Sequence, residues 1–225
     1  MKKHDSEKKY FEKFALNLLE KYLDMNISNF KDCEEPDWQD ELNSIGIEVT
    51  RDSIGTKFWA DIEKVEGKKI PDKDLKKFNS KFKANGGRII TKELASIIGI
   101  EKCSFGFNDK YVYIIPSYTD GFERINKIII NKTKKLNKNY KEKINDNRLF
   151  IFSPILVKGK MAEEELNEII RIQKEYNRNF NIIYVCILHE IYIFNMLENK
   201  CDMIEMNEVE FNKISRKSSE EIREE

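Results

Sequence analysis

The sequence contains few of the residues that several classes of site require. Its 225 residues include two histidines, four cysteines, four prolines and nine glycines. Two histidines, His4 and His189, give little material for mechanisms built on a histidine base. The cysteines show no CxxC spacing, which argues against a zinc site. We expect them to be free thiols in the reducing cytoplasm.

Long apolar runs are also missing. No stretch approaches the roughly 20 apolar residues of a membrane span. The N-terminal segment 1–5, which contains two lysines and an aspartate, is not followed by the apolar region of a signal peptide. We therefore expect a cytoplasmic protein that does not act at a membrane.

An excess of charge of one sign is absent as well. Forty basic and forty acidic residues cancel, so a general cationic coat for nucleic acid is excluded. The charges are unevenly distributed, however. Residues 32–48 carry seven acids and no base, whereas residues 125–145 carry seven lysines and one glutamate. An acidic pocket beside a lysine-rich helix would suit metal binding and phosphate contact, although charged helix faces are often merely solvated.

The run 45–50 has the two-residue period of a β-strand. Aliphatic side chains form one face, and the other face carries Glu48 and Thr50 beside Gly46. Asp37 follows a proline and would meet Glu48 if the two segments pair as a hairpin. Two converging carboxylates suit a divalent cation, because Mg²⁺ needs only one or two carboxylates plus water and substrate phosphate.

These residues resemble the metal site of the PD-(D/E)xK nuclease superfamily, which has the restriction-endonuclease-like fold. Its usual pattern is Pro-Asp, a spacer, and then acid-x-Lys on a strand. Here Pro36-Asp37 is followed by ten residues and then by Glu48-Val49-Thr50. Thr50 replaces the usual lysine, and such endings look like those of bacterial subfamilies in which a neighbouring helix supplies the lysine. The resemblance implies that Asp37, Glu48 and the Val49 carbonyl bind Mg²⁺ or Mn²⁺, and that Thr50 contacts the attacking water or substrate.

The segment 121–140 is predicted to form a helix that supplies this lysine. At roughly 100° per residue, Lys132 falls in the middle of an apolar face that comprises Phe122, Ile125, Ile129, Leu136 and Tyr140. Lysine seldom occupies such a position unless it is paired, so we predict that Lys132 is catalytic, with Lys135 as the substitute. The alternative is a lysine whose amine stays in water at the edge of the stripe. Lys135 and Lys138 are also expected to bind substrate.

A leading helix is predicted over residues 7–24, where apolar residues recur at helical spacing. In the resembled superfamily the first helix often donates a further acid to the site. By position this acid corresponds first to Glu7, which is included among the predicted catalytic residues, and second to Glu12. The alternative is that either glutamate is a first-turn acid favoured by the helix dipole.

The predicted fold class is α/β, with a restriction-endonuclease-like αβββαβ core in which helices flank a mixed central sheet. One domain is expected over residues 1–213, with an insertion over 51–110 after the second strand. The third core strand is assigned to 111–115. Beyond the fourth core strand, at 149–156, we expect a helix over 162–176 and a strand pair over 181–188 and 191–196. Residues 214–225 are expected to form a charged, frayed tail.

The predicted function is a Mg²⁺-dependent nuclease that hydrolyses phosphodiester bonds, with DNA favoured over RNA, in restriction, repair or phage conflict. One alternative is a catalytically inactive protein of the same fold that binds nucleic acid or a partner protein. Another is an unrelated α/β interaction module in which Pro36-Asp37 is only a turn. A homodimer is an open alternative, because double-strand cutters of this type often pair, but no heptad repeat supports it.

Overall fold

A computed structural model describes residues 3–52, 88–93, 104–106, 111–114, 118–139, 144–153, 162–187 and 189–224. The chain divides into two compact units. The first comprises Met1–Arg51, Ile125–Ser153 and Val157–Glu225, and the second comprises Asp52–Arg124 and Pro154–Leu156. The candidate site lies entirely in the first unit.

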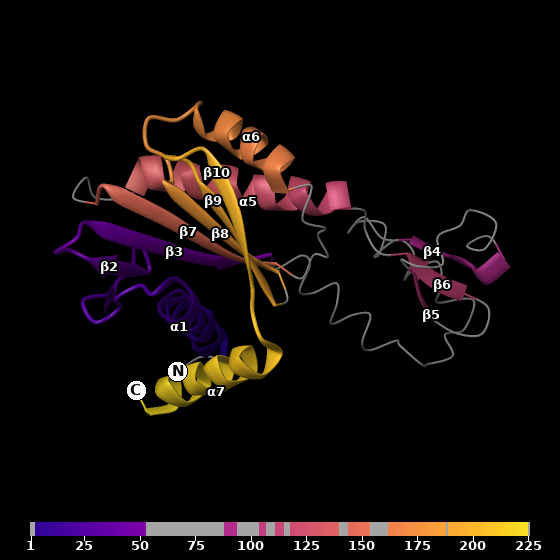
Figure 1. Ribbon diagram of the computed structural model, residues 1–225, viewed down its shortest axis with the longest axis horizontal. Helices are drawn as coiled ribbons and strands as arrows, with labels where there is room; N and C mark the ends of the chain where they lie inside the picture. The colour runs from indigo at the N-terminus through magenta and orange to yellow at the C-terminus, as the bar shows by residue number, and fades with distance from the viewer. Residues whose placement is uncertain are drawn as a thin grey trace. The chain divides into compact units, whose positions relative to one another are not determined.

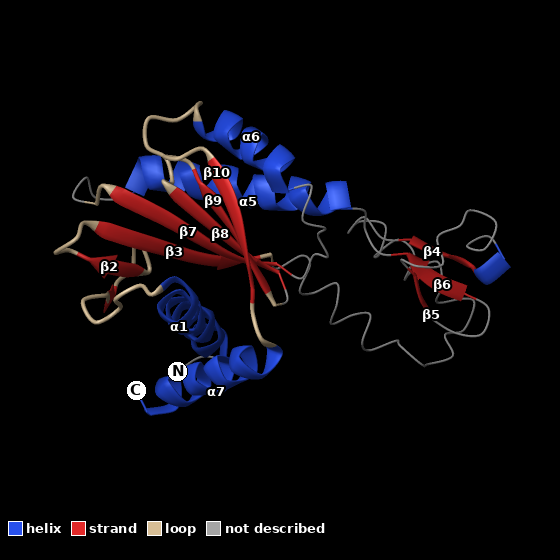
Figure 2. Ribbon diagram, viewed as in Figure 1, coloured by secondary structure: helices blue, strands red, loops and turns tan. Residues whose placement is uncertain are grey.

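The first unit contains both helices and strands (Figures 1 and 2). Its helices are α1 (Lys3–Leu23), α5 (Tyr118–Asn139, whose first residues belong to the second unit), α6 (Ala162–Gln173) and α7 (Glu208–Glu224). Its strands are β1 (Lys31–Asp32), β2 (Trp38–Asp40), β3 (Ile45–Arg51), β7 (Asp146–Ser153), β8 (Ile182–Ile187), β9 (Glu190–Asn195) and β10 (Lys200–Glu205).

The seven strands form one mixed sheet in the order β1-β2-β3-β7-β8-β9-β10. β1, β2 and β3 form an antiparallel meander, β7 is parallel to both β3 and β8, and β8, β9 and β10 are again antiparallel. α5 is the crossover between the parallel strands β3 and β7. The predicted α/β class, with a mixed sheet flanked by helices, is therefore confirmed.

Helices cover both faces of this sheet (Figure 1). α5 and α6 lie on one face, and α1 lies on the other with α7 alongside it. On the α1 side, Phe14 stacks on Phe152 of β7 with ring centroids 5.5 Å apart, and Phe211 of α7 meets Phe14 edge-on. Each buried side chain of this kind contributes about 1.5–3 kcal/mol, so the cluster fixes α1 and α7 against the sheet.

The second unit contains a separate antiparallel sheet in the order β4-β6-β5, formed by Arg88–Thr91, Tyr111–Ile114 and Ser104–Gly106. The prediction that the strand at 111–115 belongs to the main sheet is therefore wrong, since Tyr111–Ile114 pairs with β4 and β5. The third strand of the meander is instead β1, whose two exposed polar residues give no hydrophobic pattern. The second unit also extends to Arg124, beyond the predicted insertion.

The predicted fraying beyond Lys213 is also wrong. α7 continues to Glu224, and Ile214 and Ser218 are buried against the rest of the unit. Asn17 of α1 donates a 2.9 Å hydrogen bond to the Ser218 hydroxyl, and the Tyr10 and Ser215 hydroxyls are 2.7 Å apart. Ser215 and Ser218 follow the apolar residues Phe211 and Ile214 on this face of α7, so hydrophobic periodicity alone did not extend the helix to Glu224.

Among the described residues, no helix is long and apolar enough to span a lipid bilayer.

Candidate functional site

Asp37 immediately precedes β2, and the β2–β3 pairing determines its position. Trp38 lies opposite Ile47 in this antiparallel pair. One further step of the register places Asp37 opposite Glu48, and cross-strand neighbours of this kind have Cβ atoms about 4.5–5.5 Å apart. Gly46 permits the approach, because a Cβ there would lie 2.6 Å from Cγ of Pro36. The proline ring therefore occupies the space that a side chain at residue 46 would fill.

The Asp37 carboxylate is only 2 % exposed and has a different partner on each oxygen. Oδ2 accepts a 2.8 Å hydrogen bond from the Val49 backbone N–H, and Oδ1 accepts one of 3.1 Å from the Lys8 amine of α1. The N–H and C=O of one strand residue point to the same edge of the strand. The Val49 carbonyl is therefore directed toward the same edge as Asp37.

Glu48 lies on the opposite face of β3 from the apolar cluster under α1. Its neighbours Ile47 and Val49 belong to that cluster, whereas Glu48 meets α5. The carboxylate is 1 % exposed, and its Oε1 accepts hydrogen bonds of 2.5 Å from Lys132 Nζ and 3.2 Å from Lys135 Nζ. The structure thus brings the lysine in the middle of the apolar face of α5 onto the acidic strand residue, and the substitute lysine onto the same oxygen.

α1 contributes Glu12 and Lys8 to this region. The Lys8 amine lies 2.8 Å from Glu12 Oε1 as well as 3.1 Å from Asp37 Oδ1, so it bridges two carboxylates that are both almost fully buried. The Trp38 indole N–H donates a 2.9 Å hydrogen bond to the Glu12 carbonyl and holds this turn of α1 against β2. Glu7 lies within α1, but its side chain falls outside the described residues.

The clustering of acids changes their proton affinity. Burial, and then the negative charge of Glu48, raises the pKa of Asp37 to about 7, although the Val49 N–H and Lys8 oppose this change. Burial lowers the pKa of Lys8, but its contacts with Glu12 and Asp37 outweigh this effect and raise the pKa above its ordinary value. For Lys135, burial is likewise outweighed, here by Glu48 and Glu35, and the pKa is raised.

The donor set suits a hard divalent cation such as Mg²⁺ or Mn²⁺. Asp37, Glu48 and the Val49 carbonyl offer oxygen ligands, and the bridging Lys8 ammonium shows that a positive charge is accommodated at Asp37. Within the described part of the chain, no three acidic, histidine or cysteine side chains are grouped as a metal cage. The pair fits Mg²⁺ nonetheless, because this ion binds through one or two carboxylates with waters and substrate phosphates.

The other predicted substrate contacts have separate positions. Thr50 is half-buried on the same face of β3 as Glu48, since the two are two residues apart along the strand. Lys138 is exposed near the end of α5 and lies outside the buried cluster.

The contribution of Lys8 to the site was not predicted from the sequence. Its spacing of four residues from Glu12 was the available signal, since residues so spaced are neighbours on a helix.

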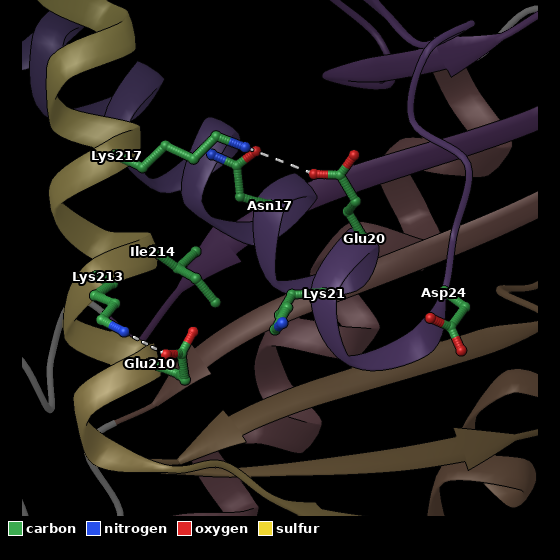
Figure 3. Close-up of a pocket in the computed structure, with 8 residues that line it drawn as sticks. All are labelled: Asn17, Glu20, Lys21, Asp24, Glu210, Lys213, Ile214 and Lys217. Carbon is green, nitrogen blue, oxygen red and sulfur yellow. Dashed lines mark hydrogen bonds and ion pairs between the residues drawn. The ribbon is translucent and has the colours of Figure 1, made fainter.

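A groove between α1 and α7 is an alternative location for a ligand (Figure 3). Its charged lining consists of three acids and three lysines: Glu20, Asp24, Glu210, Lys21, Lys213 and Lys217. Lys213 pairs with Glu210 at 2.6 Å, and Lys217 with Glu20 at 3.7 Å. Because the charges balance, the groove selects neither anions nor cations. We therefore assign the candidate site to the Asp37–Glu48 region.

Comparison with known proteins finds no family model, curated protein or solved structure that matches this chain.

Proposed function

We propose that the protein is a metal-dependent nuclease that hydrolyses phosphodiester bonds in nucleic acid. The observation that carries this proposal is the meeting of three chain segments at one buried point. Asp37 precedes β2, Glu48 lies opposite it on β3, and Lys132 of α5 donates a hydrogen bond to Glu48. Buried carboxylates with an amine are expensive to maintain, so their presence together favours a chemical role.

The topology of the first unit supports the same proposal. A helix, an antiparallel three-stranded meander, a crossover helix and a parallel strand follow in order as α1, β1-β2-β3, α5 and β7. This order agrees with the αβββαβ core of the restriction-endonuclease-like fold, to which we propose the unit belongs. The main segment of the second unit, Asp52–Arg124, is inserted after β3 and includes the start of α5, which leaves this order intact.

In the proposed mechanism, Asp37, Glu48 and the Val49 carbonyl would hold Mg²⁺ or Mn²⁺. When bound, the cation supplies charge stabilisation at the scissile phosphate and lowers the pKa of a water molecule. The Lys132 ammonium lies next to Glu48 and offsets negative charge that develops on the phosphate oxygens. Thr50 provides a hydroxyl on the same face of β3 and can orient the attacking water, but it cannot supply a positive charge.

The test is cleavage of a panel of single-stranded DNA, double-stranded DNA and RNA, with Mg²⁺, with Mn²⁺ and with EDTA. Cleavage should require a divalent cation and should be abolished by Asp37→Asn and by Glu48→Gln. Lys132→Met should lower the rate by about a hundredfold or more, the size of effect that loss of one preorganised group stabilising transition-state charge has. The matched controls are Asp32→Asn, an exposed acid of β1, and Lys200→Met, an exposed lysine of β10. Undiminished cleavage in EDTA would contradict the mechanism.

The second candidate function is a catalytically inactive nuclease-fold protein that binds nucleic acid or a partner protein. One observation favours it, because Lys132 and Lys135 both bind the same Glu48 oxygen and already compensate its charge. Metal-independent nucleic-acid binding, with no cleavage in any metal and no effect of Asp37→Asn on affinity, would establish this alternative.

A further inference from the structure

The ammonium group of Lys8 occupies the position in which a cation would bind to Asp37. It lies 3.1 Å from Asp37 Oδ1 and 2.8 Å from Glu12 Oε1. The other Asp37 oxygen already accepts the Val49 N–H. A divalent cation that binds Asp37 through Oδ1 must therefore displace the Lys8 amine.

We infer that Lys8 is a built-in competitor of the metal ion at the proposed nuclease site. This inference rests on the proposed function, because it concerns the same Asp37 carboxylate. In the absence of metal, the lysine compensates two buried acids, Asp37 and Glu12. When metal binds, the cation takes over this compensation and the amine is released.

The surroundings of Lys8 permit such an exchange. Its side chain is 58 % exposed, whereas those of Glu12 and Asp37 are 7 % and 3 % exposed. The lysine can therefore move into water while both acids stay in place. A cleft lined by Lys8, Lys9, Glu12, Asp32, Cys33 and Glu34 opens beside the pair and gives an ion access to Glu12.

Lys132 and Lys135 do not compete in the same way. Both amines bind Glu48 Oε1 from α5, and neither is placed on Asp37. Lys8 is thus the described lysine that contacts Asp37, and its removal leaves the Glu48 contacts unchanged. A single substitution can separate competition at Asp37 from the predicted role of Lys132.

Mn²⁺ binding by purified protein without nucleic acid tests the inference, with the ion measured by electron paramagnetic resonance and by calorimetry. Lys8→Met should bind Mn²⁺ roughly tenfold more tightly than wild type, a change of about 1.4 kcal/mol, because the ion no longer has to displace an amine from Asp37. Its melting temperature should be lower than that of wild type in EDTA and should rise more on addition of Mn²⁺.

Lys9→Met is the matched control. Lys9 is the next residue of α1 and pairs with the exposed Asp32 at 3.2 Å, so its removal changes the net charge equally without freeing Asp37. If Lys8→Met and Lys9→Met gain the same affinity for Mn²⁺, the effect comes from net charge alone and the inference is overturned.

The remaining outcomes separate the inference from the proposed function. Metal binding that Asp37→Asn abolishes, but that Lys8→Met leaves within twofold of wild type, would refute the competition and retain the metal site. Binding detected only in Lys8→Met would support the competition. Absence of Mn²⁺ binding in every variant would overturn the inference, whereas the proposed function would be overturned by absence of cleavage in both Mg²⁺ and Mn²⁺.

Discussion

Lys132 Nζ donates a 2.5 Å hydrogen bond to Glu48 Oε1 and so joins the middle of α5 to the acidic face of β3. This contact explains why a lysine lies within an otherwise apolar helix face, where Ile125, Ile129 and Leu136 are fully buried. The Lys132 side chain is 23 % exposed, and the Glu48 side chain is 1 % exposed. The lysine therefore compensates a carboxylate that has almost no access to water.

We predict that Lys132→Met destabilises the protein by about 1–3 kcal/mol, because it removes one of two amines from a buried carboxylate. Adding Glu48→Gln should recover most of this loss, since no charge then needs compensation. Urea unfolding of the two single variants and the double variant measures the coupling. Lys134→Met, an exposed position on the same helix, should stay within about 0.5 kcal/mol of wild type. A Lys132→Met protein as stable as wild type would refute the coupling.

The sequence was most informative where charge interrupts a regular apolar pattern. The alternation around Glu48 predicted a strand with this glutamate on its polar face, and the helical stripe around Lys132 predicted a paired lysine within an apolar helix face. The structure places the two side chains in contact. Their catalytic roles stay predictions. The sequence was least informative where an element has little hydrophobic pattern. β1 has two exposed residues, and the packed face of α7 includes the small polar residue Ser218.

Tertiary contacts account for the other features of the structure that the sequence did not predict. Lys8 looks like an ordinary first-turn lysine in the sequence, and its contact with Asp37 joins residues 29 positions apart. The strand Tyr111–Ile114 was correctly located, but its sheet depends on pairing with β4 and β5, which a single strand's pattern does not encode.

The stability of the metal-free protein should depend on pH through Asp37. Its folded pKa is raised to about 7 by burial and by Glu48, whereas an unfolded aspartate titrates near about 3.9. Between these values the folded state binds more protons than the unfolded state, so the free energy of unfolding should fall as pH rises from about 4 to about 7. Above that range this contribution should level off.

Urea unfolding in EDTA at pH 4.5 to 8 measures this dependence, compared in wild type and Asp37→Asn. As pH rises, the free energy of unfolding of wild type should fall relative to that of Asp37→Asn. Asp32→Asn, at an exposed acid, should instead keep a constant offset from wild type. A pH-independent difference between wild type and Asp37→Asn would show that Asp37 does not titrate in this range.

The C-terminal helix should contribute to stability rather than fray. Ile214→Ala should lower the free energy of unfolding by about 2–4 kcal/mol, because Ile214 is 8 % exposed and its truncation leaves a cavity beneath α7. Val209→Ala on the same helix, at a 62 % exposed position, should change it by less than about 0.5 kcal/mol. Thermal and urea unfolding of both variants provide the measurement. Equal, small effects would indicate that α7 is not held against α1 in solution.

Nucleic-acid binding should depend on exposed lysines of α5. Lys127, Lys134 and Lys138 are all exposed, and their spacings of seven and four residues place them on one face of the helix. With a rise of about 1.5 Å per residue, they form a row that can follow successive phosphates. Each phosphate contact contributes about 0.9 to the slope of log affinity against log salt for duplex DNA, and about 0.7 for single strands.

The triple variant Lys127→Met, Lys134→Met and Lys138→Met should therefore reduce the salt slope by about 2–3. Fluorescence anisotropy between 50 and 300 mM salt, in EDTA to prevent cleavage, measures it. The charge-matched control replaces Lys200, Lys213 and Lys217 of β10 and α7 with methionine, and should leave the slope unchanged. At saturating substrate the α5 triple variant should cleave at the wild-type rate, because these lysines contact phosphates and not the reacting atoms. Equal losses of slope in both triple variants would mean that binding follows net charge and that α5 is not the nucleic-acid surface.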